Sequence, residues 1–431
     1  MMLRAFFSFI FMCLFTTSTV AGSRVFDLGS QASDVDATAL TQAVKYNQAR
    51  GFGFDFNTAA QAIVESHSVV AQQSLYFSVD LPQGHYQVEL TLGSDLAAST
   101  NTVKAESRRL MLNQIKVVKG QHITRRFMVD VRSPFISSEK RIALKERERD
   151  DVNWDNKLTL EFAAGSAIRR IAITPLADIT TMYLAGDSTV TDQDVEPWAS
   201  WGQLITQYLK PTIVVANYAV SGASLYSFKA EHRLEKILSL VKPGDYVFIQ
   251  FAHNDEKRRG EGIGPWQSYA DLLNEYIERV QAKQAIAVLL TPVQRRFFNA
   301  DGTLKPTHGD YPAAIRKVAT DKQVPLIDLT QLTTELYESW GDESSRQAFV
   351  QYPANTFPSQ PQALKDNTHF NYFGANEIAL CVIKGMLDIR LPLTDYLIDN
   401  QQAYSPANPH QFKQWTVPMS PRFVATKPDG S

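Results

Sequence analysis

The sequence has few cysteines and no excess of charge of either sign. Its 431 residues include two cysteines, Cys13 and Cys381, and Cys13 falls within a predicted leader. Loss of that leader leaves Cys381 alone in the apolar run "EIALCVIKGML", so we expect no internal disulfide and interpret Cys381 as core filling. The formal net charge of −2 provides no overall field for nucleic acid or an anionic membrane. We therefore predict neither of them as a partner of the mature chain.

Long apolar runs are missing after the first residues of the chain. Arg4 is followed by the apolar stretch "AFFSFIFMCLF" and then by small residues in "TSTVAGS". This order is typical of a signal peptide, and the apolar stretch is too short for a stable membrane anchor. We predict a signal peptide over residues 1–22 and an exported protein, periplasmic or extracellular, with a short retained anchor as the alternative.

Several catalytic motifs are absent from the sequence. It contains no G-x-S-x-G nucleophile elbow, no H-E-x-x-H zinc motif, and no G-x-G-x-x-G or Walker loop. The two cysteines also lie too far apart in the chain to form a zinc-binding pair motif. The sequence therefore predicts neither a metal site nor a nucleotide cofactor.

The first half of the chain favours β-strands. "LYFSVDLPQGHYQVELTLG" contains two alternating runs around "PQG", and "HITRRFMVDVRSP" places Phe127, Val129 and Val131 on one face. Strands of this length without helical patterns between them predict an antiparallel β-sandwich over residues 24–179. The charge-dense stretch "SEKRIALKERERDDVNWDNK" is interpreted as a solvated loop or hairpin, with a binding patch as the alternative.

From Thr181 the pattern changes to alternating strands and helices. The strand-like runs "MYLAG", "TIVVANYAV", "DYVFIQFA" and "AIAVLLTP" are apolar at nearly every position, as expected for parallel strands covered on both faces. Helical runs follow them, and "YADLLNEYIERVQAK" places Leu273 and Tyr276 on one apolar stripe. We predict an α/β domain with a doubly wound parallel sheet over residues 181–400 and an extended, proline-rich tail over residues 401–431.

Polar residues cluster directly after the strand-like runs of this second half. They comprise Asp187 with Ser188, the segments "SGAS", "HND" and "VQRRFF", and the segment "DNTH" before the last helix. Ligands of an open parallel sheet bind beyond the carboxyl ends of its strands, so these segments form one candidate edge. A serine hydroxyl at such an edge needs a base during attack, and histidine titrates close enough to neutral to act as one.

Two histidines of the second half fall at this edge, His253 and His369. Only His369 has a carboxylate three residues earlier, at Asp366, and that spacing lets one short turn supply both base and orienting acid. Asp366 is expected to hold one imidazole nitrogen protonated and leave the other facing Ser188. The alternative is that "DNTH" caps the following helix. Asp187 adjoins the nucleophile instead of the base, so we interpret it as a local hydrogen-bonding residue.

Attack on an ester also creates an oxyanion, which needs preorganised hydrogen-bond donors. The backbone N–H of Ser188 is available at its turn, and Gly222 can bring its own N–H close because it has no side chain. Asn254 offers a side-chain amide at the end of a third strand. Gly222 and Asn254 also suit ordinary turns, but all of these residues at one edge predict a serine esterase.

The blocks that hold these residues resemble those of the SGNH (GDSL-like) hydrolases. "GDST" contains Ser188, "NYAVSGAS" contains Gly222, "HND" contains Asn254, and "DNTH" contains Asp366 and His369, in the order that the family has. Within that superfamily, "GDSTV", "SWG", "QFAHND" and "TPVQRR" are similar to the pattern of rhamnogalacturonan acetylesterases. The β-rich first half also resembles the galactose-binding-like module of some bacterial members.

The resemblance implies a flavodoxin-like SGNH hydrolase domain, preceded by a galactose-binding-like β-sandwich. It implies deacetylation of rhamnogalacturonan, a pectic polysaccharide, through an acetyl-enzyme on Ser188, without a metal or other cofactor. Esters of xylan, another glycan or a lipid stay open as substrates, as does an inactive carbohydrate-binding protein, and the oligomeric state is not predicted. The family usually has glycine where this chain has Ala252, so we expect an extra methyl group beside the oxyanion region.

Four further residues are predicted to contact the polysaccharide. Arg295 and Arg296 follow a strand end and can pair with a galacturonate carboxylate, although solvated arginines are an equal alternative. Trp201 can stack on a sugar ring, although a tryptophan at a helix start also suits packing. His253 completes this set because it falls at the same edge of the sheet as Ser188.

Overall fold

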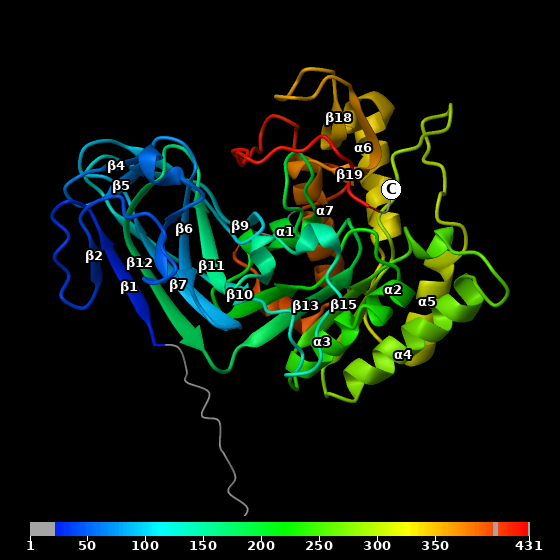
Figure 1. Ribbon diagram of the computed structural model, residues 1–431. Helices are drawn as coiled ribbons and strands as arrows, with labels where there is room; N and C mark the ends of the chain where they lie inside the picture. The colour runs from blue at the N-terminus through cyan, green and yellow to red at the C-terminus, as the bar shows by residue number, and fades with distance from the viewer. Residues whose placement is uncertain (1–21, 400–403, 430–431) are drawn as a thin grey trace, which may run out of the picture.

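The computed structural model describes residues 22–399 and 404–429, so the predicted signal peptide lies outside the described residues except for Gly22. Strands β1 to β12 form two sheets on one side of the molecule, and a parallel sheet with its helices lies on the other side (Figure 1). None of the helices in these ranges is long and apolar enough to cross a membrane.

The first two sheets are built from the β-rich half of the chain. The seven-stranded sheet has the order β10-β7-β12-β1-β2, with β5 paired to β12 and β4 paired to β5. The five-stranded sheet has the order β3-β6-β11-β8-β9. The bounds are β1 Arg24–Leu28, β2 Thr38–Leu40, β3 Phe52–Asp55, β4 Ala62–Val64, β5 Val69–Ala71, β6 Leu75–Asp80, β7 Gly84–Leu92, β8 Ser99–Ala105, β9 Arg109–Val117, β10 Ile123–Val131, β11 Lys157–Phe162 and β12 Ala167–Leu176.

Alternation along the strands explains how these two sheets share a core. In β7 the residues Tyr86, Val88 and Leu90 are buried, while the residues between them are partly exposed. Their side chains belong to one apolar cluster with Phe77 and Leu160 of the five-stranded sheet. Among the described strands of both sheets every pairing is antiparallel except that of β1 with β2, which is parallel. The expected wholly antiparallel arrangement is therefore wrong at this edge.

The third sheet is parallel throughout and has the order β14-β13-β15-β16-β17. This is the flavodoxin-like order, in which the chain switches direction between its first and third strands. The bounds of its strands and of the helices of this half are β13 Thr180–Gly186, β14 Ile213–Asn217, β15 Tyr246–Gln250, β16 Ile286–Leu290, β17 Leu326–Ile327, α1 Trp201–Leu204, α2 Leu225–Ala230, α3 Arg233–Leu240, α4 Ala270–Gln281, α5 Tyr311–Lys322, α6 Leu329–Ser345 and α7 Tyr372–Asp388.

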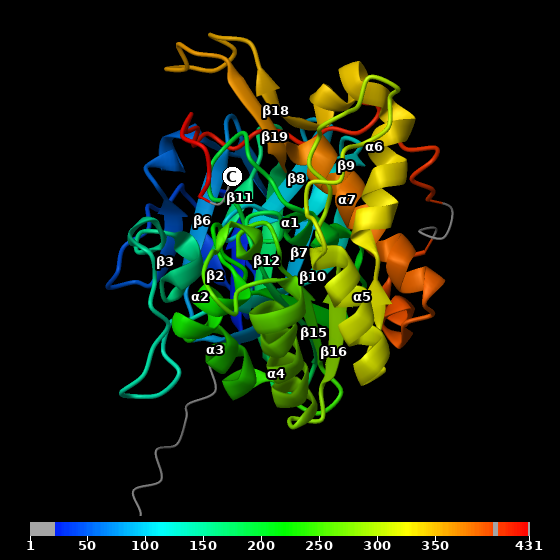
Figure 2. The same cartoon turned by 90° about the vertical axis from the view of Figure 1, so that its right-hand side faces the viewer.

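Both faces of the parallel sheet are covered, which accounts for its continuously apolar strands. On β13, Met182 and Leu184 pack in the cluster that contains α1, α6 and α7. The intervening Tyr183 and Ala185 pack in the cluster formed with α2 to α5. Helices α4 and α5 face the viewer in Figure 2, on the side away from the first two sheets.

Buried ion pairs join the two halves directly behind the turn that carries Ser188. Arg108 is paired with Glu196 at 2.6 Å and donates to the carbonyl oxygen of Trp198 at 3.0 Å. Arg132 is paired with Asp192, also at 2.6 Å. Breaking a buried pair leaves an uncompensated charge, so these contacts hold the β-rich half in a fixed position beside the site.

The charge-dense stretch is a loop, as predicted, but part of it is buried against the catalytic half, so the prediction that it is solvated is wrong for that part. It contains the 3₁₀ turns η2 (Glu146–Glu148) and η3 (Val152–Trp154). Glu148 is paired with Arg233, which is fully buried at the start of α3, and Ala143 N–H donates to the carbonyl oxygen of Glu231 at 3.0 Å. The charge of Glu148 is therefore neutralised by an arginine of the other half, which the local sequence does not indicate.

Candidate active site

Ser188 lies in a tight turn at the carboxyl end of β13. The Asp187 carboxylate accepts hydrogen bonds from Thr189 N–H at 3.0 Å and from the Thr189 hydroxyl at 2.8 Å. The Asp187 carbonyl oxygen accepts from the N–H of Val190 at 3.1 Å. A Cβ on Gly186 would lie 2.5 Å from the Val190 side chain, which explains the glycine before the turn. Asp187 therefore has the local hydrogen-bonding contacts expected of it.

The segment that carries the base is a bulge in the hairpin of β18 (Phe349–Tyr352) and β19 (Leu364–Phe370). Phe349 pairs with Phe370, yet Gln351 pairs with Lys365, so the residues between Lys365 and Phe370 form an enlarged bulge. Segment 366–369 is not a helix cap, because the N-cap of α7 is Asn371, whose side chain accepts from Gly374 N–H at 3.1 Å.

The structure brings Ser188, His369 and Asp366 into one chain of hydrogen bonds. Ser188 Oγ lies 2.8 Å from His369 Nε2, and His369 Nδ1 lies 2.8 Å from Asp366 Oδ2. Burial raises the pKa of Asp366, but hydrogen bonds from His369 and from backbone N–H groups outweigh it and lower that pKa to about 2. The carboxylate is therefore ionised across the neutral pH range and favours a proton on Nδ1, which leaves Nε2 to accept the serine proton.

The predicted oxyanion donors lie around the same turn. Within residues 22–399 and 404–429, the backbone N–H groups of Ser188 and Gly222 donate no hydrogen bond, so both are available to an oxyanion. Gly222 has φ +79°, a conformation that favours glycine. The Asn254 amide donates to the carbonyl oxygen of Ala223 at 2.9 Å, which holds that side chain against the Gly222 segment.

Gln193 is a contact of the nucleophile that no sequence motif indicated. Its amide donates to the carbonyl oxygen of Ser188 at 2.7 Å and approaches the hydroxyl of Ser221 at 3.4 Å. Gln193 therefore ties the serine turn to the segment before Gly222. The sequence does not indicate this role of Gln193, because a glutamine between two aspartates matches no known motif.

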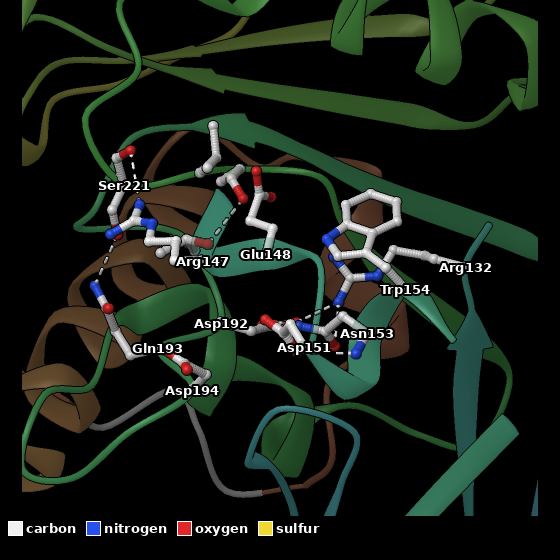
Figure 3. A pocket seen from close by; sticks show the side chains of 13 residues that line it. Arg132, Arg147, Glu148, Asp151, Asn153, Trp154, Asp192, Gln193, Asp194 and Ser221 are labelled. Atoms are coloured by element: carbon white, nitrogen blue, oxygen red, sulfur yellow. Dashed lines mark hydrogen bonds and ion pairs between the residues drawn. The ribbon is translucent and has the colours of Figure 1, made fainter. Parts of the chain in front are cut away.

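A pocket opens beside this turn. Arg147, Gln193 and Ser221 line it, and Asp151 and Asp194 lie further along its wall (Figure 3). A larger groove of about 530 Å³ shares Asp151 and Asp194 with this pocket. This groove continues to Phe56 and Tyr76 of the β-rich half and is also lined by Pro421 and Arg422 of the tail, so both halves of the chain contribute to it.

Ala252 has a buried side chain that packs with the cluster of α2 to α5. Its φ of +153° lies in a region that favours glycine. The extra methyl group expected beside the oxyanion region therefore packs within that apolar cluster. The backbone of Ala252 is strained at this φ.

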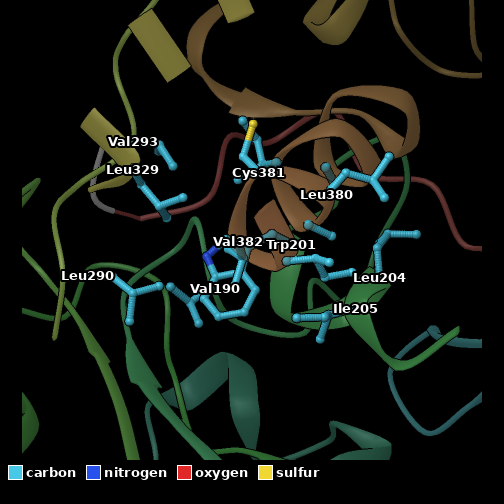
Figure 4. Packing of buried hydrophobic residues seen from close by; sticks show 14 of the residues in the cluster. Val190, Trp201, Leu204, Ile205, Leu290, Val293, Leu329, Leu380, Cys381 and Val382 are labelled. Atoms are coloured by element: carbon cyan, nitrogen blue, oxygen red, sulfur yellow. The ribbon is translucent and has the colours of Figure 1, made fainter. Parts of the chain in front are cut away.

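His253 and Trp201 are both inaccessible, and the prediction that they contact the sugar is wrong. His253 has 0% exposure and lies 3.3 Å from the Asp187 carboxylate, while burial lowers its pKa to about 4 and keeps it neutral. Trp201 has 0% exposure and packs among residues such as Val190 and Val382 (Figure 4). Within the described ranges no group of three or more His, Cys, Asp or Glu side chains is arranged to hold a metal ion.

Arg295 and Arg296 already have carboxylate partners within the protein. Arg295 is paired with Glu256, and Arg296 is paired with Asp342 and buried to 7% exposure. Arg296 also donates to the Asn367 side chain at 3.0 Å, so it supports the bulge that carries the base. Both charges are neutralised locally, which contradicts the predicted pairing with a substrate carboxylate.

Replacement of Trp201 by phenylalanine is expected to lower the free energy of unfolding by about 2 kcal/mol, because a cavity forms and a buried hydrogen bond is lost. The lost bond joins the indole N–H to Gln250 Oε1 at 2.8 Å, and Gln250 in turn donates to the Thr189 hydroxyl. Urea denaturation measures the change. Trp266→Phe is the control, since Trp266 is 50% exposed and is expected to change stability by less than about 0.5 kcal/mol. Equal effects would contradict the structural role of Trp201.

Comparison with known proteins agrees with this geometry. A family model described as GDSL-like Lipase/Acylhydrolase family matches residues 184–374, which span the segment from the Ser188 turn to the base. Rhamnogalacturonan acetylesterase RhgT of Bacillus subtilis (strain 168) is 40% identical over 222 residues, which are 51% of this chain and 95% of that protein. The probable rhamnogalacturonan acetylesterase YesY of the same organism is 36% identical over 220 residues, 50% of this chain and 97% of that protein. The uncharacterized esterase YxiM of Bacillus subtilis (strain 168) is 27% identical over 341 residues, which are 74% of this chain and 82% of that protein.

The fold, the site and these matches define a carboxylic ester hydrolase. The chain belongs to the GDSL-like lipase/acylhydrolase family, as an SGNH hydrolase close to the rhamnogalacturonan acetylesterases. The predicted family resemblance is therefore confirmed.

Proposed function

We propose that this enzyme removes acetyl groups from a plant cell-wall polysaccharide, above all from acetylated rhamnogalacturonan. The observation that carries the proposal is the hydrogen-bonded chain of Ser188, His369 and Asp366 inside the segment that the family model matches. The choice of polysaccharide is based on two relatives, RhgT and YesY, which are named as a rhamnogalacturonan acetylesterase and a probable one. Both match this chain over nearly their whole length. The groove that runs from Asp151 and Asp194 to Phe56 offers concave surface for further sugar residues of a polymer.

The proposed reaction proceeds through an acetyl-enzyme. Ser188 Oγ forms a bond to the acetyl carbonyl carbon while its proton moves to His369 Nε2. The negative charge that develops on the carbonyl oxygen is stabilised by the N–H groups of Ser188 and Gly222 and by the Asn254 amide. The carbon–oxygen bond to the sugar then breaks, and the sugar oxygen takes the proton from His369.

The second half of the reaction restores the serine. Water attacks the acetyl carbon as His369 Nε2 takes one of its protons, and the bond to Ser188 Oγ breaks. The serine oxygen regains a proton from His369, and acetate leaves. Asp366 stays ionised throughout and stabilises the imidazolium that forms twice in each cycle.

Hydrolysis of a panel of esters, followed by acetate release for the acetyl esters and by p-nitrophenol release for the octanoate ester, tests the proposed function. The panel contains acetylated rhamnogalacturonan, acetylated xylan and p-nitrophenyl octanoate as a lipid-like ester. We expect the largest kcat/KM for acetylated rhamnogalacturonan, and no acetate from the same polymer after chemical deacetylation. A larger kcat/KM for acetylated xylan or for the octanoate ester would replace the proposed substrate, and the absence of hydrolysis of every ester would overturn the hydrolytic function itself.

A further inference from the structure

A pair of cations from the β-rich half reaches the segment that holds Gly222. Lys145 Nζ donates to the carbonyl oxygen of Ser221 at 2.7 Å, and Arg147 Nη2 donates to the same oxygen at 2.9 Å. Figure 3 shows Arg147 directed at Ser221 from the η2 turn. Neither cation lies within residues 184–374, the part that the family model matches. Two positive groups that share one neutral acceptor repel each other unless an anion lies nearby.

Two acidic residues near this pair already have another cation as their partner. Glu148 and Glu231 are both paired with Arg233, which is fully buried. Burial lowers the pKa of Lys145; Glu231 opposes that shift and Arg147 adds to it. Neither Glu148 nor Glu231 is therefore left to pair with Lys145 or Arg147 beside the predicted oxyanion donors.

The carboxylate that approaches this pair comes from the tail of the same chain. Asp429 Oδ2 lies 3.6 Å from Arg147 Nη1. A Cβ placed on Gly222 would lie 2.9 Å from the Asp429 Cβ and 3.2 Å from Lys145 Nζ, so Asp429 lies directly over Gly222. Nearby, Lys427 Nζ lies 3.6 Å from the carboxylate of Asp366. The tail thus places a carboxylate next to the oxyanion donors and close to the triad.

We propose that Lys145 and Arg147 form a binding subsite for a carboxylate of the substrate, which Asp429 fills when no substrate is bound. The enzyme then prefers acetyl esters on, or next to, a uronic acid residue over esters of neutral sugars. Arginine and lysine bind carboxylates by charge-assisted hydrogen bonds. Arg147 lines the pocket beside the Ser188 turn, and Arg295 and Arg296 do not. This inference depends on the proposed esterase function, and it limits the preferred substrates of that function to esters near a uronic acid.

The first test compares kcat/KM for acetylated oligogalacturonate with kcat/KM for acetylated xylo-oligosaccharide. We expect Arg147→Gln to lower the ratio of kcat/KM for the oligogalacturonate to kcat/KM for the xylo-oligosaccharide at least about tenfold. The reason is that the variant loses one charge-assisted hydrogen bond to the substrate carboxylate. Arg149→Gln is the matched control, because Arg149 is an exposed cation of the same turn and makes no contact with Ser221 among the described residues. An unchanged ratio in Arg147→Gln would overturn the subsite.

Binding of digalacturonate to the Ser188→Ala protein, measured by calorimetry, tests the subsite without catalysis. Adding Arg147→Gln is expected to weaken binding about tenfold, and adding Asp429→Asn is expected to tighten it because the competing carboxylate is removed. Asp429 is 63% exposed, so its replacement leaves the fold intact. Equal affinity for neutral digalactose would overturn the proposal. If the wild type releases acetate from neither glycan, the proposed function fails, while the calorimetry still reports on the subsite.

Discussion

Replacement of Ser188 by alanine is expected to lower kcat for acetyl-ester hydrolysis by at least about 10⁴-fold. The variant keeps His369 and Asp366 but has no oxygen that can form the acetyl-enzyme. Ser188 is 1% exposed, so loss of the hydroxyl removes the only side-chain oxygen placed 2.8 Å from His369 Nε2 among the described residues. Initial rates with p-nitrophenyl acetate measure the change, and mass spectrometry of a quenched wild-type reaction should locate acetyl on the peptide that contains Ser188.

A buried serine of the β-rich half gives the matched control for this prediction. Ser94 is equally buried at 1% exposure, and its hydroxyl donates to Glu65 at 2.6 Å. Ser94→Ala is expected to keep kcat within about twofold of the wild type, because a substitution far from the site changes stability and not the reacting groups. A Ser188→Ala enzyme with more than a tenth of the wild-type kcat would exclude the proposed nucleophile.

The sequence could predict which segments meet at the site because the parallel sheet has a simple geometric rule. Uninterrupted apolar strands indicated a covered parallel sheet, and the carboxyl ends of such strands lie at one edge. Ser188 follows β13, Gly222 follows β14, and Asn254 follows β15 in the structure, so their positions depended only on locating the strands. The same rule brought His253 to the edge, but it could not show that His253 lies beneath the surface.

Side-chain partners were not predictable, because they come from distant parts of the chain. Arg296 is neutralised by Asp342, and Lys145 reaches Ser221 from the other half of the molecule. Periodicity describes one element at a time and does not indicate which charge lies opposite which. For the same reason a charged stretch looked solvated, although Glu148 is paired with a buried arginine. The carboxylate subsite proposed above depends on this kind of long-range contact.

Asp366→Asn is expected to lower kcat by about 10⁴-fold, because the surrounding backbone forces the wrong imidazole tautomer. Oδ1 of Asp366 accepts from the N–H groups of Thr368 at 2.8 Å and of His369 at 3.0 Å. Only the carbonyl oxygen of an asparagine can replace an acceptor there, so its NH₂ group must face His369 Nδ1. That nitrogen then accepts a hydrogen bond, the ring proton moves to Nε2, and Nε2 can no longer take the proton of Ser188.

Nitrogen-15 NMR of labelled histidine distinguishes this mechanism from a loss of structure. We expect His369 to carry its proton on Nδ1 in the wild type and on Nε2 in Asp366→Asn at pH 7. Asp95→Asn is the matched control, because Asp95 Oδ2 makes the same contact with His67 Nδ1, at 2.9 Å, in the β-rich half. That variant is expected to keep the wild-type kcat. The prediction is contradicted if the Asp366→Asn enzyme keeps the proton on Nδ1 of His369 and a kcat within tenfold of the wild type. In that case the Asp366 carboxylate does not orient the His369 ring, and another group must do so.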